Sequence, residues 1–195
     1  MTRIRKTFAP AARYLALLPA LLAINLAATA TTLTRMSLAT MSQKAPVIVR
    51  ARCLGNSTGW DAGEIWTFTS FEIEDVWRGA APARIVVRLL GGRAGNITSS
   101  VSGIPRFHAG EEAVLFLEPT PRGDFSVVSW QQGTFRIRRD SRTGEESVTQ
   151  DTASFATFDP ATRQFEATGI RNLPIDLLRA RIEAALRSTG TRRTQ

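Results

Sequence analysis

The feature that most constrains the fold is a run of five apolar residues, AVLFL at positions 113–117, between Gly110 and Pro119. A strand with one solvent-exposed face alternates apolar and polar residues, whereas this run is apolar at every position. It therefore predicts a strand that is buried on both faces. Such a strand needs other strands on both sides, so we expect it at the centre of a sheet.

The first 30 residues have the order of a secretory signal. Their charged residues are all basic, namely Arg3, Arg5, Lys6 and Arg13. A long apolar stretch follows at positions 14–26, and the small residues at positions 28–30 suit cleavage by a signal peptidase. We predict a signal peptide over residues 1–30 and a secreted or periplasmic mature protein that begins near Thr31.

A membrane anchor is the alternative for this segment. A helix needs about 17–25 apolar residues to span a bilayer. The segment is at the short end of this range and contains Pro19 and Asn25. We therefore expect cleavage, and no stable membrane span after it.

The charge of the mature chain is mild. The complete chain has 25 Lys and Arg against 17 Asp and Glu, and residues 1–30 hold four of the basic residues and none of the acidic ones, which leaves a net charge of +4. A basic surface attracts anionic partners, but this excess is small. Together with the export signal, it argues against nucleic acid as a partner.

Cys53 is the only cysteine, so the chain forms no internal disulfide. An unpaired cysteine in an oxidising compartment pairs with another chain, reacts, or is buried as a small apolar residue. Strand alternation places Cys53 on the same face as Val49 and Ala51. These neighbours predict that it is buried.

Periodicity and turn residues divide the chain into six segments. Ser37 is suited to begin a short helix, and Pro46 ends it. Near the other end, Ile175, Leu178 and Ile182 recur at helical spacing before Gly190. The expected segments are a signal peptide (1–30), a short N-terminal helix and linker (31–45), a β domain (46–150), a loop (151–172), a C-terminal helix (173–190) and a tail (191–195).

Several stretches of the β domain have the composition of strands. They are residues 47–54, 64–77, 84–90, 113–117, 125–130, 134–138 and 145–149. Between the first two, the sequence GNSTG at positions 55–59 predicts a turn. The Gly- and Ser-rich residues 91–104 predict a long loop.

The second stretch has a break in its alternation. Phe71 and Ile73 share a face, and Val76 is out of step with them by one residue. We therefore expect a β-bulge near Glu74 and Asp75, where one extra residue restores the apolar face and bends the strand. Bent strands of this kind allow a small sheet to close on itself.

The sequence shows no pattern typical of a catalytic or metal site. His108 is the only histidine, whereas a zinc-protease motif needs two and a serine triad needs a histidine with an oriented acid. The carboxylates of Glu111 and Glu112 point to opposite faces of a strand, so their spacing alone does not make an acid–base pair. We expect no enzymatic activity, no cofactor and no metal.

Aromatic residues near arginines form the candidate binding surface. Trp60 lies in the loop that Gly63 closes, and Trp66 follows it. With Phe68 and Trp77 they are the aromatic residues of this surface, and its arginines are Arg50, Arg52 and Arg78. Such a combination suits sugars, bases or a groove on a protein. His108, in the turn before the central strand, completes the candidate surface. A position in the core is the alternative for the aromatic residues.

Three groups of residues resemble a known fold. They are VRARCLG at 49–55, FEI at 71–73 with VWRG at 76–79, and GEE at 110–112 with LFL at 115–117. Over residues 45–139 the chain resembles exported bacterial proteins related to the netrin-like OB-fold, the type found in the tissue inhibitors of metalloproteinases. The resemblance implies a mainly β fold, namely a small closed or partly open Greek-key barrel with a short N-terminal helix and a C-terminal α-helix.

The resemblance does not extend to the inhibitory mechanism. The eukaryotic inhibitors bind the zinc of the protease through an amino-terminal cysteine, and this chain has no cysteine near Thr31. It also lacks the disulfides of that family. A shared fold alone does not transfer a function.

One function is expected from these observations, with two alternatives. We expect an exported, non-enzymatic binding module for a protein or envelope ligand, for example a protease-associated or inhibitor-like accessory protein. The first alternative is a hydrolase whose site is assembled from dispersed carboxylates and serines. The second is an OB-type module that binds an anionic polymer.

Overall fold

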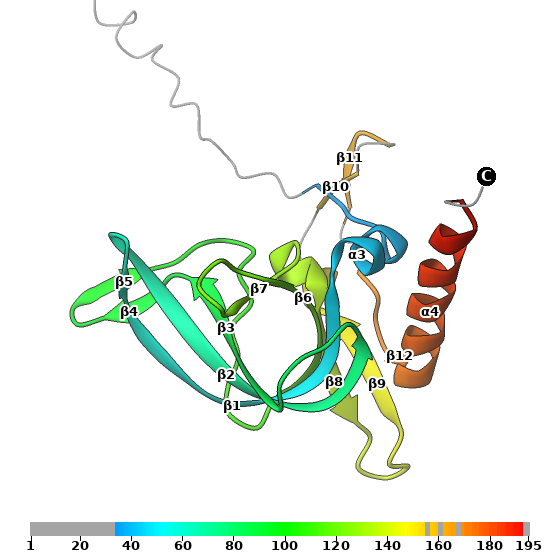
Figure 1. Cartoon of the computed structure of the whole chain (residues 1–195), viewed down its shortest axis with the longest axis horizontal. Coiled ribbons are helices and arrows are strands. Elements are labelled where there is room, and N and C mark those ends of the chain that lie inside the picture. The colour runs from blue at the N-terminus through cyan, green and yellow to red at the C-terminus, as the bar shows by residue number, and fades with distance from the viewer. Residues whose placement is uncertain (1–33, 155–156, 160–161, 167–168, 193–195) are drawn as a thin grey trace, which may run out of the picture. The chain divides into compact units, whose positions relative to one another are not determined.

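An eight-stranded mixed sheet with one short and one long helix makes up most of the structure (Figure 1). In this computed structural model the described residues are 34–154, 157–159, 162–166 and 169–192, so the expected signal peptide lies outside them. The strands of the sheet are β1 (Val47–Asp61), β2 (Glu64–Arg78), β3 (Arg84–Leu90), β6 (Glu112–Pro119), β7 (Phe125–Val127), β8 (Thr134–Arg139), β9 (Glu146–Gln150) and β12 (Leu173–Pro174). The expected mainly β fold with two helices is confirmed.

Five of these strands close partly into a ring. Their order is β1-β2-β3-β7-β6, and β1 pairs again with β6, from Val47 opposite Leu117 to Arg52 opposite Glu112. The seam between β3 and β7 holds a single parallel pair, Val87 with Phe125. Strands β8, β9 and β12 extend the sheet outward from β6.

The apolar run 113–117 lies in β6 and is buried at all five positions, which confirms the central strand. Its alternate residues face two different cores. The first, the ring core, is formed by residues that include Val49, Cys53, Phe71, Val87, Leu115 and Leu117. The second, the helix core, is formed by residues that include Met41, Ile48, Phe116, Phe135, Leu178 and Ile182.

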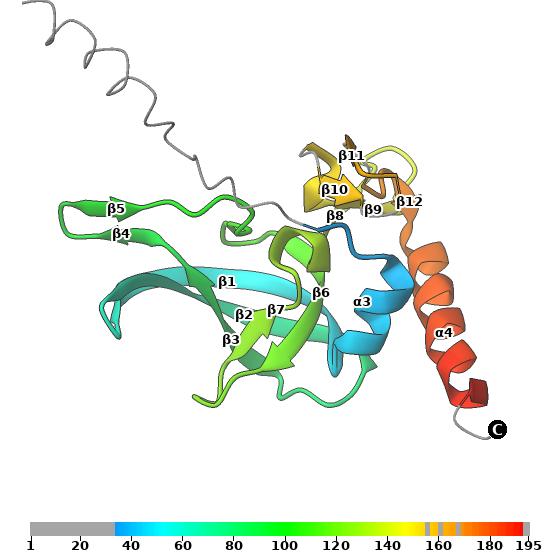
Figure 2. The same cartoon turned by 90° about the horizontal axis from the view of Figure 1, so that it is seen from above.

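Two helices cover the outer face of the sheet over β6, β8 and β9 (Figure 2). Helix α3 (Leu38–Lys44) begins after Ser37, whose side chain accepts a hydrogen bond from the N–H of Thr40 at 3.1 Å, as the sequence predicted. Helix α4 (Ile175–Arg192) continues past Gly190, where we expected it to end. No helix among the described residues is long and apolar enough to cross a membrane.

The long hairpin of β1 and β2 contains the predicted bulge. Arg50 is opposite Asp75 and Ala51 is opposite Ile73, so Glu74 is the extra residue. The predicted turn at 55–59 is wrong, because β1 continues through these residues to Asp61. Its Thr and Ser side chains suit a strand that leaves the ring and pairs only with β2.

Two expected loops contain further hairpins. Within residues 91–104, strands β4 (Gly92–Ala94) and β5 (Ile97–Ser99) pair around a two-residue turn at Gly95 and Asn96. Within residues 151–172, strands β10 (Thr157–Asp159) and β11 (Gln164–Glu166) are antiparallel, with Asp159 opposite Gln164. Two 3-10 helices also interrupt the expected strands and loops, namely η1 (Trp130–Gly133) and η2 (Asp151–Ser154).

Candidate functional site

The structure separates the residues of the predicted binding surface. Trp66 is opposite Gly59 and Trp60 is opposite Ile65, so the two tryptophans point to opposite faces of the β1–β2 hairpin. Trp60 is 57% exposed and Trp66 is half-buried. Arg50 lies ten residues before Trp60 on β1, roughly 30 Å away at the rise of a strand. One continuous surface therefore does not hold all the predicted residues.

Trp66 belongs to a cluster that we call the aromatic–arginine face, made of Trp66, Phe68 and Arg88. The guanidinium carbon of Arg88 lies 4.9 Å from the ring centre of Trp66 and 5.6 Å from that of Phe68. Arg88 is opposite Phe68 in the sheet, and its neighbour Val87 points into the ring core. The aromatic–arginine face therefore lies on the outer side of the ring, over β2 and β3.

Two carboxylates fix Arg88 over the rings. Its Nε lies 2.7 Å from Asp124 Oδ2, and its Nη2 lies 3.1 Å from Asp61 Oδ2. Asp61 also accepts a hydrogen bond from Arg122 at 2.5 Å. Burial opposes the ionisation of Asp61, but the hydrogen bonds from Arg122 and Arg88 outweigh it and lower its pKa. Asp61 and Asp124 thus hold the guanidinium of Arg88 in place over the two aromatic rings.

An open groove of about 560 Å³ continues this face toward the seam of the ring. Ser70 is opposite Val86 in the sheet, two residues from the pair of Phe68 with Arg88, so all four point to the same side. Among the lining residues, Leu54 and Val86 are large apolar side chains exposed to 41% and 38%. The outer side of β2 and β3 therefore combines aromatic, apolar and fixed cationic groups.

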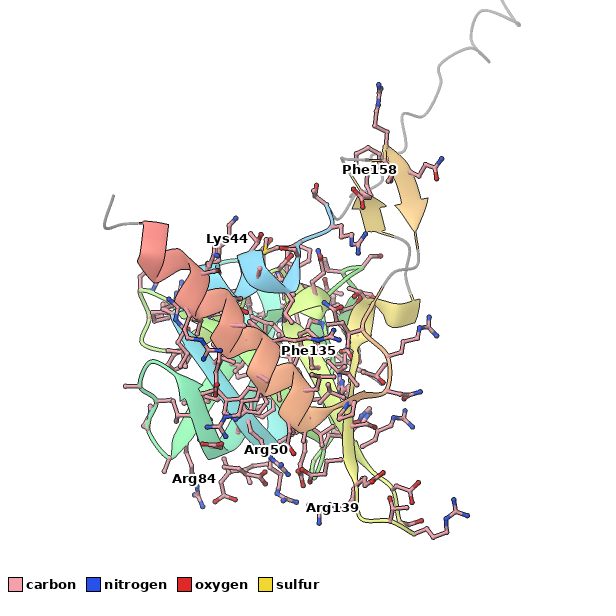
Figure 3. The ribbon with its side chains drawn as sticks, turned by 90° about the vertical axis from the view of Figure 1, so that its right-hand side faces the viewer. Lys44, Arg50, Arg84, Phe135, Arg139 and Phe158 are labelled. Carbon is pink, nitrogen blue, oxygen red and sulfur yellow. The ribbon has the colours of Figure 1, made fainter. Side chains whose placement is uncertain are left out.

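Arg50 and Arg52 form a separate network of ion pairs with carboxylates. Arg50, whose side chain is labelled in Figure 3, belongs to β1. It binds Glu74 at 2.8 Å, Glu112 at 2.7 Å and Glu146 at 2.6 Å. Arg52 binds Glu74 and Glu112. The hydrogen bond from Arg50 lowers the pKa of Glu146 to about 2, and in turn Glu146 raises the pKa of Arg50. The ion pairs of these two arginines connect β1 with β2, β6 and β9.

His108 lies at the rim of a third surface, the charged cleft. The cleft has a volume of about 530 Å³, and its lining residues include Arg106, His108, Glu111, Arg136, Arg138 and Glu146. The side chain of His108 is 83% exposed, and its Nδ1 lies 3.1 Å from Glu111 Oε1. Burial opposes the ionisation of Glu111, but hydrogen bonds from the backbone and ring of His108 lower its pKa.

Several carboxyl groups of the described residues are held in their ionised form by hydrogen bonds. The carboxyl groups of Asp61, Glu74, Glu111, Asp140 and Glu146 all have lowered pKa values. A general acid at neutral pH needs a raised pKa instead. Among the described residues, no group of three or more His, Cys, Asp or Glu side chains is placed to hold a metal ion.

Sequence reasoning missed Arg88 and the two aspartates of the aromatic–arginine face. Phe68 and Arg88 are 20 residues apart and meet only because β2 pairs with β3. Asp124 stands in a predicted turn, and aspartate is common in turns because its side chain hydrogen-bonds the nearby backbone. The sequence signal for this face is that Trp66 and Phe68 are two residues apart on one strand and therefore point to the same side.

Comparison with known proteins gives no family assignment. No protein-family model matches the chain, and no curated protein is found to match it. The netrin-like resemblance of the sequence therefore stays a prediction. The function is inferred from the geometry of the surfaces described above.

Proposed function

We propose that the protein is an exported, non-enzymatic binding module that holds a protein or envelope ligand on its aromatic–arginine face. The observation that carries this proposal is the position of Arg88. Two carboxylates hold its guanidinium against Trp66 and Phe68 on the outer side of the ring. A preorganised cation–aromatic surface loses little side-chain entropy when a ligand binds.

The proposal includes the finer fold assignment, an OB-like Greek-key barrel. Its support is the strand order β1-β2-β3-β7-β6, with β1 returning to β6 and with β3 parallel to β7. OB-folds bind their ligands over the second and third strands and over the loops after the first and fourth. The aromatic–arginine face occupies this region, with Asp61 from the end of β1 and Asp124 from the turn after β6.

The charge of this face favours an uncharged or apolar ligand group. Arg88 is balanced by Asp61 and Asp124, and Arg122 also binds Asp61. An anionic polymer would be held by several unpaired cations, whereas Arg84 is the one arginine of the groove without an ion-pair partner among the described residues, so this alternative has less support here. The hydrolase alternative also has less support, because a general acid needs a raised pKa, whereas the pKa values of Asp61 and Glu146 are lowered. A sugar ring or an apolar side chain of an exported protein, such as a protease, fits the half-buried aromatic rings and the exposed apolar side chains of Leu54 and Val86.

Binding measurements with single-site variants test the proposal. The wild type is titrated with soluble envelope saccharides and with exported proteases, with calorimetry as the readout. Trp66→Ala and Arg88→Ala should each weaken the binding of a ligand by roughly tenfold, which corresponds to about 1.4 kcal/mol. Trp60→Ala is the matched control, because Trp60 is exposed on the opposite face of the hairpin and should leave affinity unchanged.

The same variants distinguish binding from catalysis. The wild type should not turn over esterase, glycosidase or protease substrates. If the wild type turned over one of these substrates and a purified variant did not, the proposal would be contradicted. Equal affinities of the wild type, Trp66→Ala and Arg88→Ala for every bound ligand would also contradict it.

A further inference from the structure

Strands β6 and β8 diverge at one end and leave a fork between them. Their pairing ends at Ala113 opposite Arg136. Before Ala113 the chain stays paired with β1, because Glu112 is opposite Arg52 and the N–H of Gly110 donates to the Cys53 carbonyl at 2.8 Å. Strand β8 instead continues to Arg139, paired with β9 only. Over residues 137–139, no strand among the described residues pairs with the edge of β8 that faces the fork.

The charged cleft occupies this fork. Residues of β8 form one wall, and Gly110, Glu111 and Glu112 form the other. Its volume of about 530 Å³ lies within the range of ligand pockets. A strand edge with unpaired N–H and C=O groups is a template for an additional strand.

The arginines of the cleft differ in their partners. Arg136 binds Glu111 and Asp151, and Arg139 binds Glu146. Arg106 and Arg138 are exposed and have no ion-pair partner among the described residues. The cleft therefore has two cations available for an anionic ligand beside an unpaired strand edge.

We propose that this fork binds an extended acidic segment of a partner protein. The segment adds as a strand to residues 137–139 of β8, and its carboxylates bind Arg106 and Arg138. Arg136 and Arg138 point to the same face and Ile137 points to the other, so the segment alternates acidic and apolar residues. If the β8 strands of two copies paired with each other instead, their arginines would lie opposite one another. This repulsion disfavours self-pairing. This site is separate from the aromatic–arginine face and does not rest on the function proposed for it.

A blocked hexapeptide of alternating glutamate and valine tests the inference. With a fluorescent label at one end, the anisotropy of the peptide should rise on titration with the intact wild-type protein. The double variant Arg106→Gln/Arg138→Gln should weaken this binding by at least about tenfold, because it removes both available cations. Arg142→Gln removes the same charge from the exposed β8–β9 turn, outside the cleft, and should leave the affinity unchanged.

A second pair of peptides separates strand addition from simple anion binding. N-methylation of alternate peptide nitrogens removes the N–H groups that would pair with β8 and keeps every carboxylate. The methylated peptide should bind at least about tenfold more weakly. Equal affinity of the methylated peptide, no loss in the double variant, or no binding to the wild type would each overturn the inference. Trp66→Ala should bind the hexapeptide normally, so a failure here is distinguishable from a failure at the aromatic–arginine face.

Discussion

Cys53 is a structural residue of the ring core. It is 1% exposed, and burial raises the pKa of its thiol, which lowers the fraction of reactive thiolate. We expect native protein to react slowly with a thiol reagent and denatured protein to react at once. Cys53→Ser should lower the free energy of unfolding by about 1–3 kcal/mol, because the buried hydroxyl needs a hydrogen-bond partner. Rapid labelling of the native protein would contradict this assignment.

Glu146 makes the stability of the protein depend on pH. The hydrogen bond from Arg50 lowers the pKa of Glu146 from 4.5 to about 2. A group with a lowered folded-state pKa stabilises the fold fully above its unfolded-state value and loses this contribution as the pH falls toward its folded-state value. From this group we expect a loss of about 2 kcal/mol in the free energy of unfolding between pH 4.5 and pH 2.

Urea unfolding at a series of pH values measures this contribution. Glu146→Gln should have a shallower pH dependence than the wild type below pH 4.5. The exposed neighbour Glu145 has no ion-pair partner among the described residues, so Glu145→Gln is the control and should keep the wild-type slope. Parallel profiles for the wild type and Glu146→Gln would show that the pair with Arg50 does not contribute.

Strand β6 contributes to both cores with neighbouring residues. Leu115 lies in the ring core and Phe116 lies in the helix core, and both are fully buried. We expect Leu115→Ala and Phe116→Ala each to lower the free energy of unfolding by roughly 2–5 kcal/mol, the range for large core residues. Glu118→Ala, at an exposed position of the same strand, should stay within about 0.5 kcal/mol of the wild type. If either Leu115→Ala or Phe116→Ala left the denaturant midpoint unchanged, the burial of β6 on both faces would be contradicted.

The elements that the sequence predicted well have local signals. The apolar run of β6, the Ser37 cap before α3 and the bulge at Glu74 each depend on residues close together in the chain. The extension of β1 through residues 55–59 was missed because its Gly, Asn, Ser and Thr residues are also typical of turns. The β4–β5 turn at Gly95 and Asn96 does carry a recognised hairpin signal, which the glycine-rich surroundings obscured.

The surfaces were harder to predict, because their residues come from distant parts of the chain. Arg50 meets Glu146, 96 residues later, only because β1 and β9 lie on either side of β6 and β8. The predicted surface placed Trp60 beside Trp66, but strand parity places them on opposite faces. Alternation therefore could have separated these tryptophans, whereas the carboxylates around Arg50 and Arg88 depend on the strand order.

The two cores are joined through the strands that they share. Strand β1 contributes Val49 to the ring core and Ile48 to the helix core, and these neighbours pair with Leu115 and Phe116 of β6. Opening of the helix core would therefore expose one face of two strands that close the ring. We infer that the ring and the helices unfold as one cooperative unit, as most single domains of this size do.

Helix α4 provides a matched pair of substitutions to test this cooperativity. Leu178 is fully buried against the sheet, whereas its neighbour Leu177 is 43% exposed. Leu178→Ala should cost roughly 2–5 kcal/mol, and Leu177→Ala should stay within about 0.5 kcal/mol of the wild type. In Leu178→Ala, far-ultraviolet circular dichroism and tryptophan fluorescence should report the same denaturant midpoint, because loss of the helix core also removes the support of β6. Two separate midpoints would mean that α4 detaches from a ring that remains folded.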